Sequence, residues 1–294
     1  MKEQTIYALG FFDGVHLGHQ ALLRTCRELA DCHGCRAGVV TFASHPDGLV
    51  SGKAPVLLST IEDRERLLQA YGMDSVITLP FDRKLMTTPW SDFLGQLVDS
   101  GAAGFVCGDD FRFGAGGSGT AKKLSAFCEK RGLPWAIVPQ QELEGIRISS
   151  THIRHLIEEG DMASATRFLG HPHVLSGTVV KGRGLGHTIG IPTANLALPE
   201  DVICPQHGVY ACKAIVDSRE HLAVTNIGMR PTVEGHHVTV EPWILDFDSD
   251  LYGKEITLLF FEFLRPEQKY ASLEDLKAEI QKNAVQTRKI LENS

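Results

Sequence analysis

The sequence predicts an α/β domain with a parallel, Rossmann-like sheet over residues 1–170, followed by an all-β domain over residues 174–294. In the first half, short runs rich in β-branched and aromatic residues alternate with amphipathic stretches, as in strands joined by crossover helices. After Gly170 most β-rich runs follow one another without a helix-length pattern between them, which favours an antiparallel sheet or a small barrel. The chain closes with an amphipathic segment that we expect to pack on that barrel as a helix.

Five strands, separated by four helices, are expected in the first part of the α/β domain. The strand-like runs are "TIYALG", "AGVVTF", "DSVITL", "GFVCG" and "WAIVP". The helical stretches that separate them are Gln20–Ala30, Glu62–Tyr71, Trp90–Ser100 and Ala121–Arg131. Thr88 followed by Pro89 predicts an N-cap with proline at the first helical position. In such a sheet, ligands bind at the carboxyl ends of the strands, near a switch in strand order.

Two short helices are expected to end the first domain. They correspond to "STHIRHLIEEG" and "DMASATRFLG", with Asp161 as the N-cap of the second and Gly170 as its stop. The strand-like runs of the second domain are "SGTVVKG", "GVYACKAIVD", "HLAVTNIG", "HHVTVEPWILDF" and "EITLLFFEFL". In the closing segment, Ser272 is the expected N-cap. The expected apolar stripe of that helix consists of Leu273, Leu276 and Ile280.

The composition argues against several classes of protein. The chain has 294 residues, of which 43% are hydrophobic and 22% charged, so a buried core is expected. A net charge of −7 argues against a general nucleic-acid partner. There is no apolar run near the length of a membrane span and no signal-peptide pattern, so we expect a cytoplasmic protein without a membrane partner. Cys32 and Cys35 form a lone CxxC, for which reduced structural thiols are favoured over a zinc site.

The stretch "GFFDGVHLGH", at 10–19, is the first candidate site. It lies between an expected strand and an expected helix, where backbone amides and the helix dipole favour an anion. Its glycines allow the backbone to approach a phosphate closely. His16 and His19 could hydrogen-bond that phosphate, whereas a zinc site would need a third protein ligand. Taken alone, the stretch is equally compatible with a glycine turn that carries two surface histidines.

Two further stretches of the first domain occupy similar junctions. "GDDFRFG" follows an expected strand, and "RISSTHIR" precedes an expected helix. Arg147 and Arg154 add cations to the second stretch. Hydroxyl groups that can cap that helix while facing a second phosphate come from Ser149, Ser150 and Thr151. Three such junctions in one α/β domain support a phosphate site more strongly than any one of them.

The second domain has its own candidate residues. "VVKGRGLGHTIGIPTANL" joins a glycine-rich loop to Thr193 and Asn195, whose oxygen atoms suit Mg²⁺ bound with ATP phosphates. The alternative for "PTAN" is a turn that leads into a strand. Glu241 lies in an alternating run and could act as general base toward a primary alcohol. An isolated glutamate on a strand is, however, usually only solvated.

Together these motifs resemble the bacterial bifunctional riboflavin kinase/FAD synthetase family over nearly the whole chain. The resemblance rests on "GFFDGVHLGH", "TFASHP", "GDDFRFG", "RISSTHIR", "GIPTANL", "GVYA", "NIGMRPTV" and "DLYGK", in that order. It implies that the first domain is a nucleotidyltransferase that joins FMN to AMP from ATP, giving FAD and pyrophosphate. It implies that the second is a flavokinase barrel of six antiparallel strands that phosphorylates riboflavin with ATP. The implied partners are riboflavin, FMN and ATP, with Mg²⁺ as cofactor.

The resemblance also implies residue roles in the first domain. His16 and His19 would contact the ATP phosphates and stabilise the transition state, and Arg147, Ser150 and Thr151 would hold the phosphates from the other side. Asp110 would lie near the adenylation site. Phe42 would lie near the flavin, or could simply be core. The other ATP-binding positions are Gly10, Phe11, Asp13, Gly14 and Arg154, the last of which could instead be a structural salt-bridge partner.

In the second domain, Thr193 and Asn195 match the family's Mg²⁺–nucleotide positions, and Glu241 matches its base. Arg265 falls in the flavin-proximal region near the last helix. The implied nucleotide loop contains Gly182, Gly184 and Gly186.

Four positions depart from the pattern common in the family. Ser44 replaces a proline, and Gly117 lies in a loop, "AGGSGT", that often carries a basic residue, so we expect that loop to be more mobile and to grip phosphate less tightly. His187 replaces a frequent arginine, which weakens the fixed positive charge near the nucleotide at neutral pH. Pro242 follows Glu241 directly and lacks a ladder donor, so a strand edge or start is expected there.

Two alternatives to a bifunctional enzyme stay open. One is an enzyme in which only one of the two activities, most plausibly the adenylyltransferase, is functional, and the other is a flavin-sensing or regulatory protein that kept the fold. The sequence leaves the preferred metal and homo-oligomerisation open.

Overall fold

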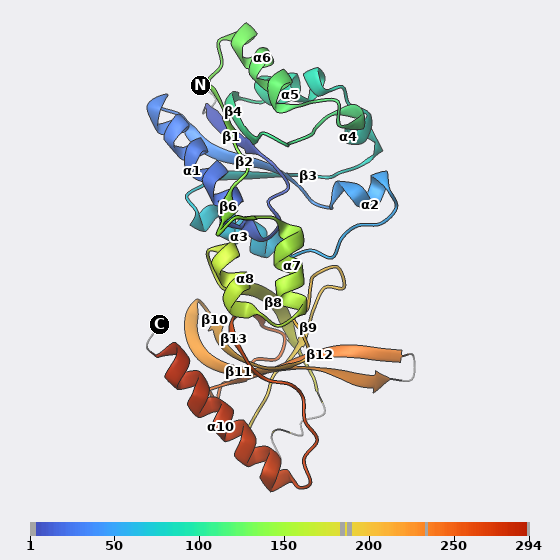
Figure 1. The fold of residues 1–294 in the computed structure, drawn as a ribbon, viewed down its shortest axis with the longest axis vertical. Coiled ribbons are helices and arrows are strands. Elements are labelled where there is room, and N and C mark those ends of the chain that lie inside the picture. The colour runs from blue at the N-terminus through green and yellow to red at the C-terminus, as the bar shows by residue number, and fades with distance from the viewer. Residues whose placement is uncertain (1–3, 183–185, 187–189, 233–234, 293–294) are drawn as a thin grey trace. The chain divides into compact units, whose positions relative to one another are not determined.

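The structure is a computed structural model that describes residues 4–182, 186, 190–232 and 235–292. The chain divides into two compact units, one of residues up to 57 with 61–150, the other of residues 58–60 with 151–294. Figure 1 shows an α/β unit and a β-barrel unit, which confirms the predicted fold class. The helices that the sequence placed at the end of the first domain group with the barrel.

The first unit contains a five-stranded parallel sheet in the order β3-β2-β1-β4-β5. Its strands are β1 (Thr5–Leu9), β2 (Arg36–Phe42), β3 (Ser75–Leu79), β4 (Ala102–Gly108) and β5 (Trp135–Val138), one for each β-rich run. Strand β1 pairs with β2 on one side and with β4 on the other, so the strand order reverses beside it. Ligands of such sheets bind at this switch point, beyond the carboxyl ends of the strands.

The four predicted helices of this unit are α1 (Leu17–Cys32), α3 (Ile61–Ala70), α5 (Trp90–Asp99) and α6 (Ala121–Arg131). Short elements without a sequence signal join them: η1 (Asp13–Val15), α2 (Pro46–Val50), α4 (Arg83–Thr87), η2 (Ala115–Gly117), β6 (Glu142–Leu143) and β7 (Ile146–Arg147). The predicted Thr88 cap is wrong. Thr88 ends α4, where its hydroxyl donates to the Lys84 carbonyl at 2.8 Å, and Pro89 itself precedes α5.

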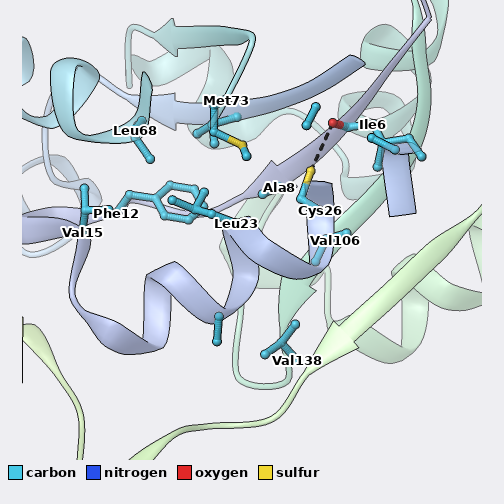
Figure 2. Close-up of a cluster of buried hydrophobic side chains, with 14 residues drawn as sticks. Ile6, Ala8, Phe12, Val15, Leu23, Cys26, Leu68, Met73, Val106 and Val138 are labelled. Carbon is cyan, nitrogen blue, oxygen red and sulfur yellow. Dashed lines mark hydrogen bonds between the residues drawn. The ribbon is translucent and has the colours of Figure 1, made fainter. Parts of the chain in front are cut away.

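A buried cluster between α1 and the sheet anchors the loop that follows β1 (Figure 2). Phe12 and Val15 of that loop are fully buried in the same cluster as Leu23 of α1. Cys26 donates from its Sγ to the Ile6 carbonyl at 3.3 Å, and burial raises the pKa of its thiol to about 11. The thiol is therefore protonated at neutral pH and serves packing rather than nucleophilic chemistry.

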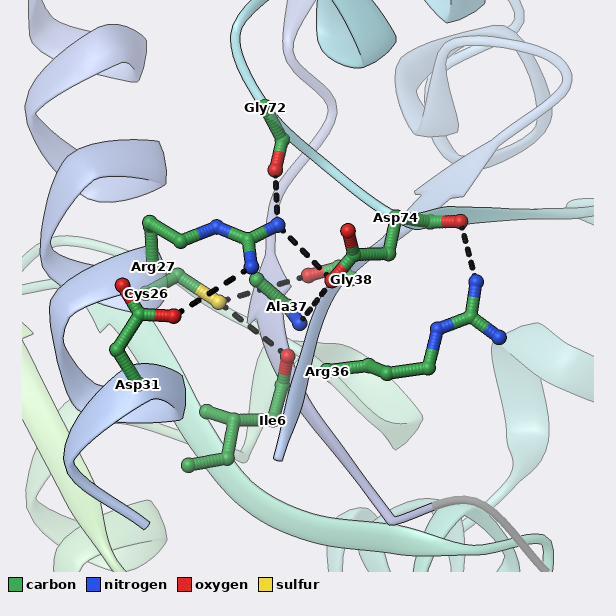
Figure 3. Close-up of polar contacts among 9 residues, drawn as sticks. All are labelled: Ile6, Cys26, Arg27, Asp31, Arg36, Ala37, Gly38, Gly72 and Asp74. Carbon is green, nitrogen blue, oxygen red and sulfur yellow. Dashed lines mark hydrogen bonds and ion pairs between the residues drawn. The ribbon is translucent and has the colours of Figure 1, made fainter. Parts of the chain in front are cut away.

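At the amino ends of the strands, polar contacts tie α1 to the start of β2 and to the turn before β3 (Figure 3). Arg27 of α1 pairs with Asp74 at 2.9 Å and also donates to the Gly72 carbonyl. The Asp74 carboxylate also accepts from the Ala37 amide at 2.9 Å, and the backbone carbonyl of Asp74 accepts from the Arg36 guanidinium at 2.8 Å. These contacts lie at the end of the sheet opposite to the switch-point crevice.

The second unit contains a closed barrel in the strand order β10-β11-β12-β9-β8-β13, with every neighbouring pair antiparallel. This confirms the six-stranded antiparallel barrel. The strands are β8 (His173–Val180), β9 (Asn195–Ala197), β10 (Gly208–Val216), β11 (Arg219–Thr232), β12 (Gly235–Ile244) and β13 (Glu255–Arg265).

In the described part of the chain, the helices that group with the barrel and have defined bounds are α7 (Ser150–Glu158), α8 (Met162–Leu169) and α10 (Leu273–Leu291). Asp161 caps α8 by accepting from the Ser164 amide at 2.9 Å, and Gly170 ends it in the left-handed region, both as predicted. Ser272 accepts from the Asp275 amide at 3.1 Å and caps α10, also as predicted. No helix in the described part of the chain combines the length and hydrophobicity that a membrane crossing requires.

The predicted apolar stripe of α10 is only partly correct. Leu273 is 49% exposed, whereas Leu276 and Ile280 are half-buried. The buried face lies in the second half of the helix and consists of Asn283, Ala284, Thr287 and Leu291. The first half instead extends over a cavity in the side of the barrel.

Candidate active sites

The loop between β1 and α1 brings the two predicted histidines together. His16 is the N-cap of α1, and its Nδ1 accepts from the His19 amide at 3.3 Å. The two rings stack, with centroids 3.6 Å apart and planes 12° from parallel. The helix therefore begins at Leu17, before the predicted Gln20, because a histidine supplies the capping acceptor that serine or aspartate usually provides.

His19 is electrically neutral at neutral pH. Its Nδ1 is buried and has no hydrogen-bond partner among the described residues. Burial, with smaller effects of His16 and Arg64, holds the pKa of His19 well below its usual 6.5. A neutral imidazole can act on a phosphate through a hydrogen bond rather than through a full charge.

The same loop has an unusual backbone. Phe12 has φ 59° and Val15 has φ 42°, in the left-handed region that β-branched residues rarely adopt. Gly14, at φ 72°, occupies that region without a side-chain penalty. Gly10 lies against the Phe12 ring, which a Cβ at Gly10 would approach to 3.0 Å. Core packing of Phe12 and Val15 thus maintains a strained loop at the switch point, as is common at functional sites.

Arg64 of α3 lies beneath this loop and has no signal in the sequence beyond its place in an amphipathic helix. It is fully buried, donating to the Phe11 carbonyl at 3.2 Å and to the Phe42 carbonyl at 2.7 Å. Its guanidinium carbon is 4.5 Å from the centre of the Phe11 ring. Burial lowers the pKa of Arg64, and the buried Asp13 is the largest influence that opposes this change.

A cavity of about 740 Å³ adjoins these residues in the first unit. Phe42 was predicted to lie near the flavin or in the core; it is 7% exposed, packs edge-on against Phe81 at 5.5 Å, and lines the cavity. The other aromatic rings of its wall belong to Phe11, His45, Phe81, Phe93, Phe111 and Phe113. Such walls suit a flat aromatic ligand.

The "GDDFRFG" and "RISSTHIR" stretches, which are far apart in the sequence, are in direct contact in the structure. Asp110 accepts from Arg147 at 2.8 Å and from Gln140 at 3.0 Å. The Asp110 and Arg147 side chains are more than half exposed, so their ion pair adds little stability and a ligand can replace it. Ser150 donates to the Asp13 carbonyl at 3.1 Å and so reaches the histidine loop. Thr151 is exposed and Arg154 half-buried; both lie on α7, within the second unit.

Two cavities in the barrel unit share Thr193. A cavity of about 230 Å³ beneath α10 is lined by Thr193, Glu241 and Arg265, three of the predicted kinase residues. A second cavity, of about 470 Å³, is lined by Thr193, Pro242 and the segment 247–252. Thr193 therefore lies between two cavities that could each bind a different substrate.

The glycines of the predicted nucleotide loop lie against the predicted metal ligands. A Cβ at Gly182 would collide with the side-chain amide of Asn195, and one at Gly186 would lie 3.1 Å from the Thr193 hydroxyl. These glycines leave a cradle beside two oxygen ligands, which suits a small hard cation bound with phosphates. Two other positions of this loop that the sequence singled out, Gly184 and His187, lie outside the described residues.

Arg265 contacts the terminal helix, near which the sequence placed it. Its Nε donates to Asn283 at 3.1 Å and lies 3.8 Å from Glu279. Its guanidinium carbon is 5.7 Å from the Tyr270 ring. The side chain thus joins β13 to α10 at the wall of the smaller cavity.

Glu241 is opposite Asn226 of β11, and both line the smaller cavity. Pro242 lies inside β12 rather than at its start. Its carbonyl accepts from the Ala194 amide at 2.9 Å, beyond the single β9 pairing at Val240. In a strand, the N–H and C=O of one residue point to the same side, so an N–H at position 242 would also face the β9 side. The β9 pairing has ended there, so proline loses no strand hydrogen bond, as at the strand edge that we expected.

The α/β unit has a strained loop at the switch point of its sheet, and the barrel unit has a glycine cradle between two cavities, an arrangement that fits a transferase with one candidate site in each unit. Two family models match the chain, FAD synthetase over residues 1–152 and riboflavin kinase over residues 169–291.

Curated relatives match both halves at once. The bifunctional riboflavin kinase/FMN adenylyltransferase of Listeria monocytogenes is 36% identical over 292 residues, which cover 96% of this chain and 91% of the relative. The enzyme of that name from Escherichia coli K12 is 38% identical over 295 residues, covering 98% and 93%. The chain belongs to the bifunctional riboflavin kinase/FMN adenylyltransferase family and unites both enzyme activities.

A solved structure shows the same two-unit fold. The crystal structure described as a macrolide-efflux protein from Streptococcus pneumoniae has a TM-score of 0.87 and 29% identity, and covers 98% of this chain and 95% of that one.

Proposed function

We propose that the barrel unit phosphorylates riboflavin to FMN with ATP and that the α/β unit adenylylates FMN to FAD with a second ATP. The observation that carries this assignment is that each unit has its own cavity, lined by residues that the sequence independently singled out for that step. Phe42 lies in the first unit, and Thr193, Glu241 and Arg265 lie in the second.

In the kinase step, riboflavin occupies the smaller cavity beneath α10, and the ATP phosphates lie at Thr193, with the nucleotide in the larger cavity. Glu241 accepts the proton of the riboflavin 5′-hydroxyl as its oxygen attacks the γ-phosphorus. The new P–O bond forms, the bond from the γ-phosphorus to the bridging oxygen breaks, and ADP leaves. Thr193 and Asn195 would hold Mg²⁺, which neutralises phosphate charge.

In the adenylylation step, an oxygen of the FMN phosphate attacks the α-phosphorus of ATP, and pyrophosphate leaves. His16, His19 and the first amides of α1 donate hydrogen bonds to phosphate oxygens, so the loop stabilises charge without a protein nucleophile. Arg147 leaves Asp110 to bind phosphate, and Ser150 holds the loop through Asp13. The strained loop supports this role because its shape is set before ligands arrive.

The flavin ring of FMN occupies the 740 Å³ cavity beside Phe11 and Phe42. Arg112, which is exposed at the cavity wall and has no ion-pair or hydrogen-bond partner in the described structure, is the candidate cation for the flavin phosphate. The cytoplasmic location and the lack of nucleic-acid and membrane partners stay predictions.

The test is to incubate the purified chain with riboflavin, ATP and MgCl₂ and to separate the flavins by chromatography. We expect FMN first and FAD afterwards. His19→Ala should stop FAD formation while FMN still forms. Glu241→Gln should stop FMN formation while added FMN is still converted to FAD. A wild-type chain that yields neither product would refute the assignment.

A further inference from the structure

Arg64 makes contacts that the chemistry above leaves without a role. The carbonyl of Phe11 follows β1, and the carbonyl of Phe42 ends β2. One planar guanidinium donates to both, at 3.2 and 2.7 Å, and so joins the carboxyl ends of two strands. The Phe11 carbonyl also accepts from Thr41 at 2.8 Å, but Thr41 belongs to β2 and cannot replace a link from α3.

The two joined residues belong to different parts of the adenylylation site. Both Phe11 and Phe42 line the flavin cavity. Phe11 also begins the loop that continues through Asp13 to His16 and His19, and Arg64 is near enough to Asp13 and His19 to affect them electrostatically. Arg64 therefore links α3 to both the flavin wall and the start of the histidine loop, in addition to the contact that Thr41 makes between the two strands.

The cost of burying Arg64 argues against a role in packing alone. A fully buried guanidinium loses its hydration, and its Nε has no partner in the described structure. An apolar side chain of similar volume would fill the same space without that penalty. Such an apolar side chain could not, however, hold two carbonyls in a fixed geometry as the planar guanidinium does.

We propose that Arg64 is a positioning residue for adenylyl transfer, fixing the flavin wall relative to the histidine loop by tying the ends of β1 and β2 together. This proposal rests on the function assigned to the first unit. It concerns the alignment of the FMN phosphate with the α-phosphorus of ATP, where a displacement of about 1 Å can reduce the rate about 100-fold.

The test compares Arg64→Met and Arg64→Lys with wild type in the full chain. Met keeps the apolar stem, and Lys keeps the charge but not the fork. For both variants we expect kcat for FAD formation from FMN to fall about 10- to 100-fold. We expect KM for FMN, and the inhibition constant of lumiflavin, a flavin ring without the ribityl phosphate, to stay within about threefold. The same chain supplies an internal control, because FMN formation from riboflavin should not change.

Arg131→Met is the matched control, since it removes an exposed arginine of the same unit. Wild-type kcat in Arg64→Lys or Arg64→Met would overturn the proposal. Parallel loss of kcat and lumiflavin binding would also overturn it, because Arg64 would then only keep the cavity folded. If wild type itself forms no FAD, the function assigned to the unit fails rather than the role of Arg64.

Discussion

His16 and His19 have different structural duties, although they are three residues apart in one motif. His16 uses Nδ1 to cap α1, whereas His19 Nδ1 is buried without a partner. Replacing His16 by alanine should therefore remove both the proposed phosphate contact and a helix cap, the second worth about 1 kcal/mol. Replacing His19 should reduce catalysis with a smaller effect on the helix.

We predict that His16→Asn separates these two duties. Asparagine is a good N-cap, so the free energy of unfolding of the first unit should stay near wild type, while FAD formation falls at least tenfold. His16→Ala should lose both. The check is urea unfolding of the variants beside FAD synthesis rates. If His16→Asn were as unstable as His16→Ala, the capping role would be wrong.

The sequence could indicate the histidines but not Arg64. The two histidines, the glycines and the start of the following helix lie within residues 10–19, so a local motif contains the whole pattern. Arg64 acquires its role from carbonyls 53 and 22 residues earlier in the chain. Only folding of α3 against the strand ends brings them together, and a single arginine in an amphipathic helix gives no hint of it.

At the scale of elements, long periodic segments could be predicted and short ones could not. The strands of the sheet and helices such as α5 and α6 lie within about one residue of their sequence-based bounds, except where a strand begins one or two residues earlier. The helices α2 and α4 have five residues each, too few for a period to show. The α10 stripe was misplaced because the polar Asn283 and Thr287 pack on the barrel, which hydrophobicity does not reveal.

The Arg27–Asp74 contact should support α1 without affecting catalysis. Arg27 is the main cause that holds the pKa of Asp74 below its usual 3.8. A carboxylate with a lowered pKa stabilises the fold above that usual pKa and loses the effect as pH falls through the folded-state pKa. We predict that Asp74→Asn lowers the free energy of unfolding by about 1 kcal/mol at pH 7.

That difference should shrink in acid, as measured by urea unfolding at pH 7 and pH 3, with FAD synthesis at pH 7 unchanged. Asp31→Asn is the matched control, since Asp31 only contacts Arg27 at 3.6 Å and is 64% exposed. An Asp74→Asn effect that is equal at both pH values would contradict the ion-pair explanation.

His173 on β8 should make the barrel sensitive to acid. Burial, with a smaller effect of His171, lowers the pKa of His173 to about 3 from the usual 6.5. His173 is therefore protonated below about pH 6.5 in the unfolded chain but only below about pH 3 in the folded barrel. The free energy of unfolding consequently decreases as the pH is lowered from 6.5 to 3. The slope approaches about 1.4 kcal/mol per pH unit.

We predict that His173→Phe, which places a ring beside Phe260, flattens this slope. Hydrogen-exchange protection of β8 and β13 amides between pH 6.5 and 4.5 is the measurement. The matched control is His155→Gln, whose side chain is 70% exposed and should leave the slope unchanged. Equal slopes in wild type and His173→Phe would show that other groups govern the acid response.

For the whole molecule, a separate cavity proposed for each step predicts that the steps are chemically independent. Thr193, Glu241 and Arg265, which we propose for the kinase step, all line a cavity of the second unit, and the cavity proposed for the flavin of FMN is lined by residues of the first unit alone. A chain that has lost one site should therefore still perform the other reaction. FMN would pass between chains through solution.

We predict that a mixture of Glu241→Gln and His19→Ala chains makes FAD from riboflavin, although neither variant does so alone. The His19→Ala chain supplies FMN, and the Glu241→Gln chain converts it to FAD. Because FMN must accumulate before the second chain can use it, FAD should appear after a lag that shortens when FMN is added at the start. Flavin chromatography over time measures both. FMN without FAD in the mixture would mean that the adenylylation site accepts FMN only from the barrel of its own chain, and the two cavities would then have to be treated as parts of one reaction path.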